Sequence, residues 1–482
     1  MKFASTYNIS IAKNNILLLS VILCAPFIYL MNKTGVKTGF LFIGICLSLL
    51  IAFISLYKFT LGIYLSTCLG FIIFTLSRLI YSDIPWGTGL EILIFTTTLG
   101  MLASQKIKDN PLSLFFKNPF VIIFTIYLLY IFISVVNPAM ESKLGWIMEF
   151  KRLLSLYCFF LLIYIGLGNI KQYYLFSRFL LLLCIIAAVY GCIQQFFGFA
   201  DFEMNYILRS EARKKLLFMI SGVKRKFSLF SDPSSFGITM AASASILLSI
   251  IGNIKFSRNT LICIILLIIS LMSLAFSGTR TAYLAFSAGA CFFLLLTVNK
   301  LATRVLGVFL LFAFAVIMVI PIYSNPTLNR VRSAFDLGNE ASLNVRDVNR
   351  KSIQPYMLTH PLGGGLGTTS GNGIKNNPNH FLAGFETDSG YLKTATESGW
   401  IALILLLVQY YLILKTGLTT YFNTNKKSIK LLISSCLVCV FTFSVAQYAQ
   451  VAIGQFPDSF LFYGASAIII RTSLTLPQNN KT

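Results

Sequence analysis

Residues 261–277 read LICIILLIISLMSLAFS, a run that contains no charged side chain. Crossing a hydrocarbon core of roughly 30 Å takes about 20 apolar residues as a helix, so this run predicts a membrane-spanning helix. The rest of the 482-residue chain has the same character, with 56% hydrophobic and 11% charged residues. A soluble domain carries about a quarter charged residues, so this composition excludes soluble globular and disordered proteins. Because lipid cannot satisfy backbone polar groups, we expect an all-α, polytopic transmembrane helix bundle.

Further segments along the chain are also apolar enough to be predicted as spans. Two of them, 87–103 and 453–470, are marginal in length or polarity, so we expect about 12–14 helices in total. The further segments are 15–31, 39–57, 59–79, 87–103, 119–136, 153–168, 177–199, 234–251, 281–298, 304–323, 399–415, 428–446 and 453–470.

The distribution of charge predicts the orientation of the chain. It carries 39 Lys and Arg against 16 Asp and Glu, a formal net charge of +23. Basic residues accumulate in short cytoplasmic loops of membrane proteins, so this excess indicates topology, and we expect no nucleic-acid partner. With a cytoplasmic N-terminus, Asp109 is the one acidic residue that falls in an inside segment. We therefore expect cytoplasmic N- and C-termini.

Two predicted outer connections, 200–233 and 324–398, are too long to be turns. The second contains helical patterns at 328–335 and 344–358, and Pro361 ends the latter. The expected organisation is N-terminal transmembrane helices (1–199), a first outer loop (200–233), further transmembrane helices (234–323), a large periplasmic loop (324–398), and C-terminal helices with a tail (399–482). All ten cysteines lie in apolar runs, which indicates packing and predicts neither disulfides nor a metal site.

Polar chemistry concentrates in these outer connections. Arg280, within Ser277-Gly278-Thr279-Arg280-Thr281, falls at the outer membrane edge, where an arginine needs a polar cavity or an anionic partner. Lys224-Arg225-Lys226 supplies three consecutive cations. Both stretches fit lipid headgroups or a lipid-linked diphosphate, and the planar fork of arginine suits bidentate phosphate binding.

A glycine run follows the second helical pattern of the large loop. It reads His360-Pro361-Leu362-Gly363-Gly364-Gly365-Leu366-Gly367. Consecutive glycine amides can approach an anion closely, as in phosphate-binding nests, and the same composition also fits a flexible turn. Both histidines of the chain, His360 and His380, lie in this loop.

Four stretches together resemble the O-antigen ligase and O-antigen polymerase superfamily, whose members are bacterial inner-membrane proteins with many helices and one large periplasmic loop. They are Arg225 followed by KFSLFSDPSSFG, SGTRTAYLAF at 277–286, NVRDVNRKSIQPYMLTHPLGGGLG at 344–367 and ETDSGYLKTATESGWIALI at 386–404. The likeness covers roughly residues 224–404. Where many members carry His-Asn, this chain has Asp388-Ser389.

The resemblance implies a glycosyltransferase that acts outside the cytoplasmic membrane. The implied donor is a polyprenyl-diphosphate-linked oligosaccharide, and the implied acceptor is a glycan or a lipid-linked sugar. Membrane lipids, a chain-length regulator and a flippase are further implied partners. No cofactor and no metal are expected, because the chain has no Asp-x-Asp pair to hold the metal of a nucleotide-sugar enzyme.

Named residues follow from this reading. We expect Arg225, Arg280 and Arg346 to bind the donor diphosphate, whose developing charge preorganised arginines stabilise. The attacking hydroxyl needs a general base, for which Asp388 and His360 are the candidates and His380 a further one.

Two alternatives remain open on the sequence alone. A repeat-unit polymerase is favoured over a ligase acting on lipid A core, because the Asp388 variant and the SLFSDPSSFG stretch look more like polysaccharide polymerases. A glycan transporter is disfavoured, because the predicted helices carry few ionisable groups beyond Glu91.

Overall fold

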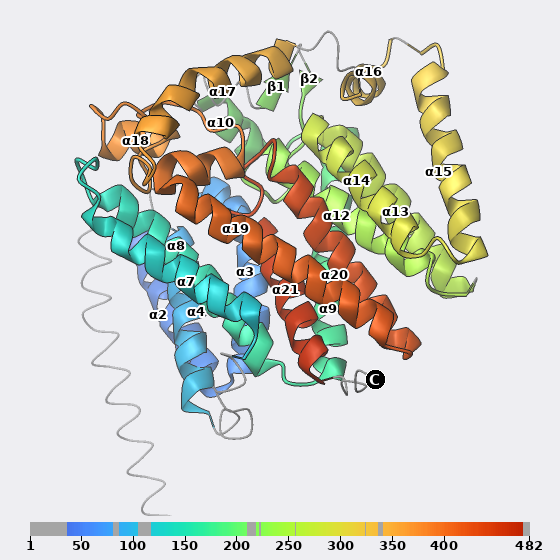
Figure 1. Cartoon of the computed structure of the whole chain (residues 1–482), viewed down its shortest axis with the longest axis horizontal. Helices are drawn as coiled ribbons and strands as arrows, with labels where there is room; N and C mark the ends of the chain where they lie inside the picture. The colour runs from blue at the N-terminus through green and yellow to red at the C-terminus, as the bar shows by residue number, and fades with distance from the viewer. Residues whose placement is uncertain are drawn as a thin grey trace, which may run out of the picture.

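The structure of the protein, a computed structural model, describes residues 36–80, 86–104, 117–209, 218–220, 223–255, 257–322, 324–335 and 341–475 (Figure 1). Within these ranges it contains 17 α-helices, and nine of them are long and apolar enough to cross a membrane. Strand structure in the described ranges is limited to one antiparallel pair, β1 (Met219–Ile220) and β2 (Val223–Lys224). The predicted all-α, polytopic helix bundle is confirmed, and the chain is a multi-pass membrane protein.

Most of the predicted spans correspond to helices, and the predicted span 15–31 lies outside the described residues. These helices are α2 (Val36–Tyr57), α3 (Phe59–Ile80), α4 (Trp86–Ala103), α7 (Pro119–Ile133), α8 (Leu144–Leu161), α9 (Ile170–Phe196), α12 (Pro233–Ile251), α13 (Arg258–Ser277), α14 (Arg280–Leu296), α15 (Leu301–Val319), α19 (Gly390–Asn423), α20 (Lys427–Ala446) and α21 (Asp458–Thr475).

Four of these helices begin five or more residues away from the start of the predicted span, among them α9, which begins at Ile170 instead of 177. Helices α8 and α19 begin nine residues earlier than the spans 153–168 and 399–415. Their first turns carry charged residues, which an apolar window leaves out. Helix α21 begins at Asp458 instead of 453, because Pro457 has no N–H to donate and is tolerated only at the start of a helix.

The centre of the bundle is α12, which packs against α13, α14 and α20. It is rich in Ala, Ser and Gly and is almost entirely buried. Small residues let membrane helices approach closely, because association in lipid depends on packing and not on a hydrophobic driving force. By contrast, α15 stands at the edge of the bundle and is mostly exposed (Figure 1).

One end of the bundle carries the short helices, and we call it the capped end (Figure 1). These helices are α10 (Asp201–Arg209), α16 (Pro326–Ser333), α17 (Ala341–Thr359) and α18 (Ser370–Asn376). Helices α16 and α17 confirm the helical patterns predicted at 328–335 and 344–358. Both long connections therefore meet at the same end of the molecule.

Helix α19 is interrupted by Gly399, which joins its first turns to the large loop. The backbone of Gly399 is non-helical, with φ 80° and ψ −178°, a region that is essentially restricted to glycine. Its position lies against the backbone of Pro361 and Leu362, and the Trp400 amide donates to the Pro361 carbonyl at 3.0 Å. The interruption therefore allows the large loop to pack directly on α19.

Replacing Gly399 with Ala is expected to destabilise the fold, because the added Cβ would lie 2.2 Å from the Pro361 carbonyl oxygen. With the strained φ, the expected loss is about 2–4 kcal/mol, seen as a lower thermal unfolding midpoint of the detergent-purified protein. Gly371→Ala is the control, since a Cβ there meets nothing within 4 Å. Equal midpoints for the two variants would contradict this account.

Candidate active site

Arg225 is held on the short turn between α13 and α14, at the capped end. Its Nε donates to the Ser277 carbonyl at 2.8 Å, and a terminal nitrogen donates to Thr279 Oγ1 at 2.7 Å. Gly278 forms the turn with φ 59°, a left-handed conformation that favours glycine. We call residues 277–279 the Gly278 turn. The first outer loop and the α13–α14 junction thus form one unit.

Two further arginines lie at the same turn. Arg280 begins α14 directly after the turn and is half-buried. Arg330 reaches the turn from α16, where its Nε donates to the Gly278 carbonyl at 3.1 Å. All three guanidinium groups are near enough to Tyr283 to act on it electrostatically. We call Arg225, Arg280 and Arg330 the arginine cluster.

The positive charges of the arginine cluster favour the binding of an anion. Burial, reinforced by the nearby Arg330 cation, lowers the pKa of Arg225 to about 10, and the Asp232 carboxylate acts in the opposite direction. Arg225 therefore stays protonated at neutral pH although the neighbouring cation disfavours its charge. An anion bound between the guanidinium groups relieves that repulsion, and arginine forks match phosphate geometry.

A buried arginine, Arg78, binds the loop that carries Arg225. Arg78, in the last turn of α3, donates to the Phe230 carbonyl at 2.8 Å and lies 4.5 Å from the ring centre of Phe227. The Ser228 amide donates to the side chain of Gln194 at 2.8 Å. The loop is therefore rigid, as a preorganised site requires.

The other basic residues expected near a diphosphate do not bond to the Gly278 turn through their side chains among the described residues. Lys224 is exposed, and the Lys226 ammonium lies 4.5 Å from the ring centre of Phe199. Arg346 is half-buried on α17, which packs against α19. In the described part of the chain, no hydrogen bond or ion pair joins Arg346 to the Gly278 turn. Arg330, which the sequence did not single out, bonds to the turn instead.

The candidate bases occupy separate places on the capped end. His360 is exposed at the end of α17, and its ring stacks on Tyr356 with centres 4.1 Å apart. His380 accepts from the Leu382 amide at 3.1 Å, and burial lowers its pKa. Asp388 is half-buried beside the start of α19, and no hydrogen bond of its carboxylate occurs among the described residues. Of the three, Asp388 therefore has an uncommitted acceptor in a partly enclosed position.

The glycine run is not an open phosphate nest. The amides of Gly363, Gly364 and Gly365 donate to the carbonyls of His360, Thr396 and Glu397, respectively. Farther along, the Gly367 backbone and the amide and hydroxyl of Thr369 bind the Glu397 carboxylate. The carboxyl group that this loop holds therefore belongs to the chain itself, and of the two interpretations of the glycine run the structure supports a turn.

The connection between α20 and α21, residues 447–457, forms hydrogen bonds both to the start of α19 and to the loop that carries Arg225. The Gln447 carbonyl accepts from the Gly390 amide at 2.9 Å and from Ser389 Oγ at 3.1 Å. Farther along, the side chain of Gln455 accepts from Ser231 Oγ at 3.1 Å. The connection thus runs from the residues beside Asp388 to the loop that carries Arg225. Sequence reasoning missed it because 453–457 is apolar and was included in a span.

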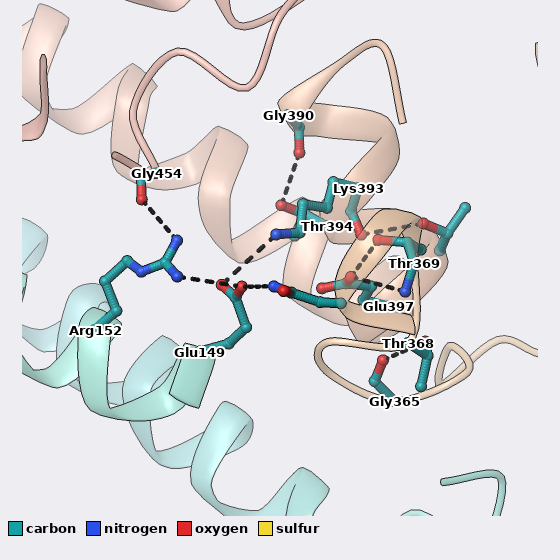
Figure 2. A network of polar contacts seen from close by, with 12 residues as sticks. Glu149, Arg152, Gly365, Thr368, Thr369, Gly390, Lys393, Thr394, Glu397 and Gly454 are labelled. Carbon is teal, nitrogen blue, oxygen red and sulfur yellow. Dashed lines mark hydrogen bonds and ion pairs between the residues drawn. The ribbon is translucent and has the colours of Figure 1, made fainter. Parts of the chain in front are cut away.

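A second polar cluster lies between α8 and α19 (Figure 2). Glu149 Oε1 accepts from Asn372 Nδ2 at 2.9 Å and lies 3.5 Å from Arg152. Glu149 Oε2 lies 3.6 Å from Lys393 Nζ. We call Glu149, Arg152, Lys393 and Glu397 the charged quartet. The expectation that the helices carry few ionisable groups beyond Glu91 is therefore wrong.

The charged quartet lines a cavity of about 120 Å³ at the capped end. Gly390, Gln447 and Gly454 form one side of it, and three tyrosines from α7, α19 and α21 form another: Tyr127, Tyr410 and Tyr463. Helical spacing is the signal that could have found the quartet, since Glu149 and Arg152 are three residues apart and Lys393 and Glu397 four.

Comparison with known protein families identifies a similarity over part of the chain. A family model described as O-antigen ligase matches residues 265–407. The matched part begins in α13 and ends within α19, so it contains the Gly278 turn, the large loop, Asp388 and half of the charged quartet. Arg225 and α8 lie outside it. A search of curated proteins found no match to the chain.

The family match covers part of the site, namely the Gly278 turn, Arg280, Arg330, Asp388, Lys393 and Glu397. It implies substrates of the lipid-linked glycan type for the part of the chain that it covers. Over residues 265–407 it confirms the resemblance to the O-antigen ligase and polymerase superfamily of membrane enzymes.

Proposed function

We propose that the protein transfers a glycan from a polyprenyl diphosphate carrier to an acceptor hydroxyl, outside the cytoplasmic membrane of a bacterium, as a repeat-unit polymerase. The observation that carries this proposal is the arginine cluster. Arg225 and Arg330 come from two separate outer connections and bond to the one turn that Arg280 follows. Such a cluster at the membrane edge suits a diphosphate whose lipid tail stays in the bilayer.

In the proposed step, the acceptor hydroxyl oxygen forms a bond to the anomeric carbon of the donor sugar. The bond from that carbon to the diphosphate oxygen breaks, and the diphosphate leaves with the electron pair. Guanidinium groups of the arginine cluster stabilise its developing charge. The proton of the hydroxyl passes to a carboxylate. The step needs no metal ion, because the arginines supply the positive charge.

We assign the general base to Asp388, with His360 as the alternative. Asp388 lies next to Ser389, which bonds the 447–457 connection that reaches the Arg225 loop. His360 is exposed, and one face of its ring is covered by Tyr356. A base must come within hydrogen-bond reach of the hydroxyl that it deprotonates, and the carboxylate of Asp388 has no hydrogen bond among the described residues.

A transporter is the competing function, and the charged quartet gives it more weight than the sequence did. The quartet residues nevertheless lie within the first turns of α8 and α19, near the capped end. A transport path needs polar groups that continue across the bilayer. Charges gathered at one end fit an enzyme that works at the membrane surface.

Replacing Arg280 with Ala is expected to reduce glycan transfer about 100-fold or more, the usual cost of removing one preorganised donor to a developing anion. Arg330→Gln is expected to act in the same direction. Transfer is measured with purified protein and the lipid-linked repeat unit extracted from a deletion strain. Arg258→Ala is the matched control, because Arg258 is exposed at the opposite end of α13. Normal transfer by Arg280→Ala would contradict the assigned role.

Replacing Asp388 with Asn is expected to lower the rate of transfer about 100-fold, since general-base catalysis contributes roughly 10²–10⁴-fold. His360→Gln is expected to retain most of the activity. Single-turnover rates with saturating donor separate this effect from substrate binding. The opposite pattern would assign the base to His360.

Surface glycan from a deletion strain is expected to carry one repeat unit per acceptor, which indicates a lost polymerase. The glycan is resolved on a gel and compared with the strain in which the gene is restored. Full-length chains that remain on the lipid carrier would instead indicate a lost ligase. Complementation with Arg280→Ala is expected to reproduce the deletion pattern.

A further inference from the structure

The cavity beside the charged quartet takes no part in the proposed step, although it lies close to Asp388. Gly390 and Gln447 form its wall, and the Ser389 hydroxyl between Asp388 and Gly390 donates to the Gln447 carbonyl. The cavity opens toward water at its cations, because the side chains of Arg152 and Lys393 are 32% and 23% exposed. A molecule in the cavity would therefore reach the neighbourhood of the base.

The cations of the quartet have donor groups that are not used. Lys393 Nζ carries three donors, and its ion-pair partner among the described residues is Glu149 at 3.6 Å. Arg152 lies 3.5 Å from Glu149 and 3.3 Å from the Gly454 carbonyl. These contacts are long for charge-assisted hydrogen bonds, so the quartet does not use the full donor capacity of its two cations. Ionisable residues in membrane helices are expensive and typically serve a ligand.

Two tyrosines of the cavity lining also present unused groups. The hydroxyls of Tyr410 and Tyr463 form no hydrogen bond within the described residues, although both side chains are largely buried. Buried tyrosine hydroxyls normally find a partner. Their rings supply flat apolar walls beside the charged groups. An apolar wall with a few converging polar groups is the usual composition of a small-molecule site.

The balance of charge identifies the class of ligand. Two acidic and two basic side chains line the cavity, so it offers both hydrogen-bond donors and acceptors. A sugar ring matches this composition, because each hydroxyl both donates and accepts. A diphosphate does not match it, since the carboxylates of Glu149 and Glu397 would repel it. The arginine cluster and the cavity therefore suit different parts of the substrates.

We infer that this cavity, whose wall includes Gly390 two residues from Asp388, binds the terminal neutral sugar of the acceptor glycan. Glu149, Lys393 and Arg152 hold the sugar hydroxyls, and Tyr410 and Tyr463 line its apolar face. This inference rests on the proposed function, which supplies the donor and the reaction. The diphosphate of the donor lies at the arginine cluster, reached from the cavity wall along residues 447–457.

Binding of two separate probes to the full-length protein in nanodiscs tests the inference. One probe is the repeat-unit oligosaccharide, released by mild acid from the lipid carrier of a deletion strain, and the other is polyprenyl diphosphate. Lys393→Met is expected to weaken oligosaccharide binding about tenfold or more, and Tyr410→Phe about fivefold, the effect of one lost hydrogen bond. Neither variant is expected to change binding of polyprenyl diphosphate. Arg280→Ala is expected to show the reverse pattern.

Control variants distinguish a failure of this inference from a failure of the proposed function. Tyr411→Phe is the matched control, because Tyr411 is the exposed neighbour of Tyr410, and Lys393→Arg is expected to restore part of the oligosaccharide binding. If Tyr410→Phe and Lys393→Met both bind the oligosaccharide as the wild type does, or if the wild type does not bind it, the inference is overturned. Unchanged polyprenyl diphosphate binding by Arg280→Ala would instead overturn the site of the proposed function.

Discussion

Lipid cannot solvate charge, and this constraint decides where the polar groups of the chain lie. A charged side chain within the hydrocarbon is stable only when it pairs or faces water. The charged quartet gathers in the first turns of α8 and α19, and the arginine cluster at the Gly278 turn, both at the capped end. Much of the remaining surface is exposed leucine, isoleucine, valine and phenylalanine, as on α15. Both polar clusters that we consider for function therefore lie at one end of the bundle.

Close backbone packing fixes the positions of the charged side chains in the quartet. The interruption of α19 at Gly399 lets the large loop bond the carbonyls of Thr396 and Glu397. The same loop supplies Thr369, which fixes the Glu397 carboxylate. A flexible loop could not hold a buried carboxylate, because each lost hydrogen bond to a charged group costs about 1.5–3 kcal/mol. The glycines therefore serve the charged quartet through packing, and not through contact with a phosphate.

The sequence predicts the membrane spans well but the site only in part. Both outcomes arise because apolar windows detect hydrophobic segments and leave out charged residues. Apolar windows find helices such as α13 and α20 almost to the residue. They fail at the starts of α8 and α19, where charged residues belong to the helix, so Glu149 and Lys393 were not predicted to face each other. Arg225 and Arg280 are adjacent to recognisable motifs, whereas Arg330 reaches the Gly278 turn only through the fold. Tertiary contacts of this kind leave no local pattern in the chain.

The two polar clusters differ in net charge, and this difference bears on how a large substrate could be placed. A neutral sugar at the Gly278 turn would leave the repulsion between Arg225 and Arg330 unrelieved, whereas an anion in the charged quartet would meet two carboxylates. The arginine cluster thus disfavours the sugar, and the charged quartet disfavours the diphosphate. Repulsion as well as attraction therefore sets the orientation of the bound substrate. The 447–457 connection is fixed to both sides by hydrogen bonds of Gln447 and Gln455. The spacing between the clusters is consequently a property of the fold, present before any substrate binds.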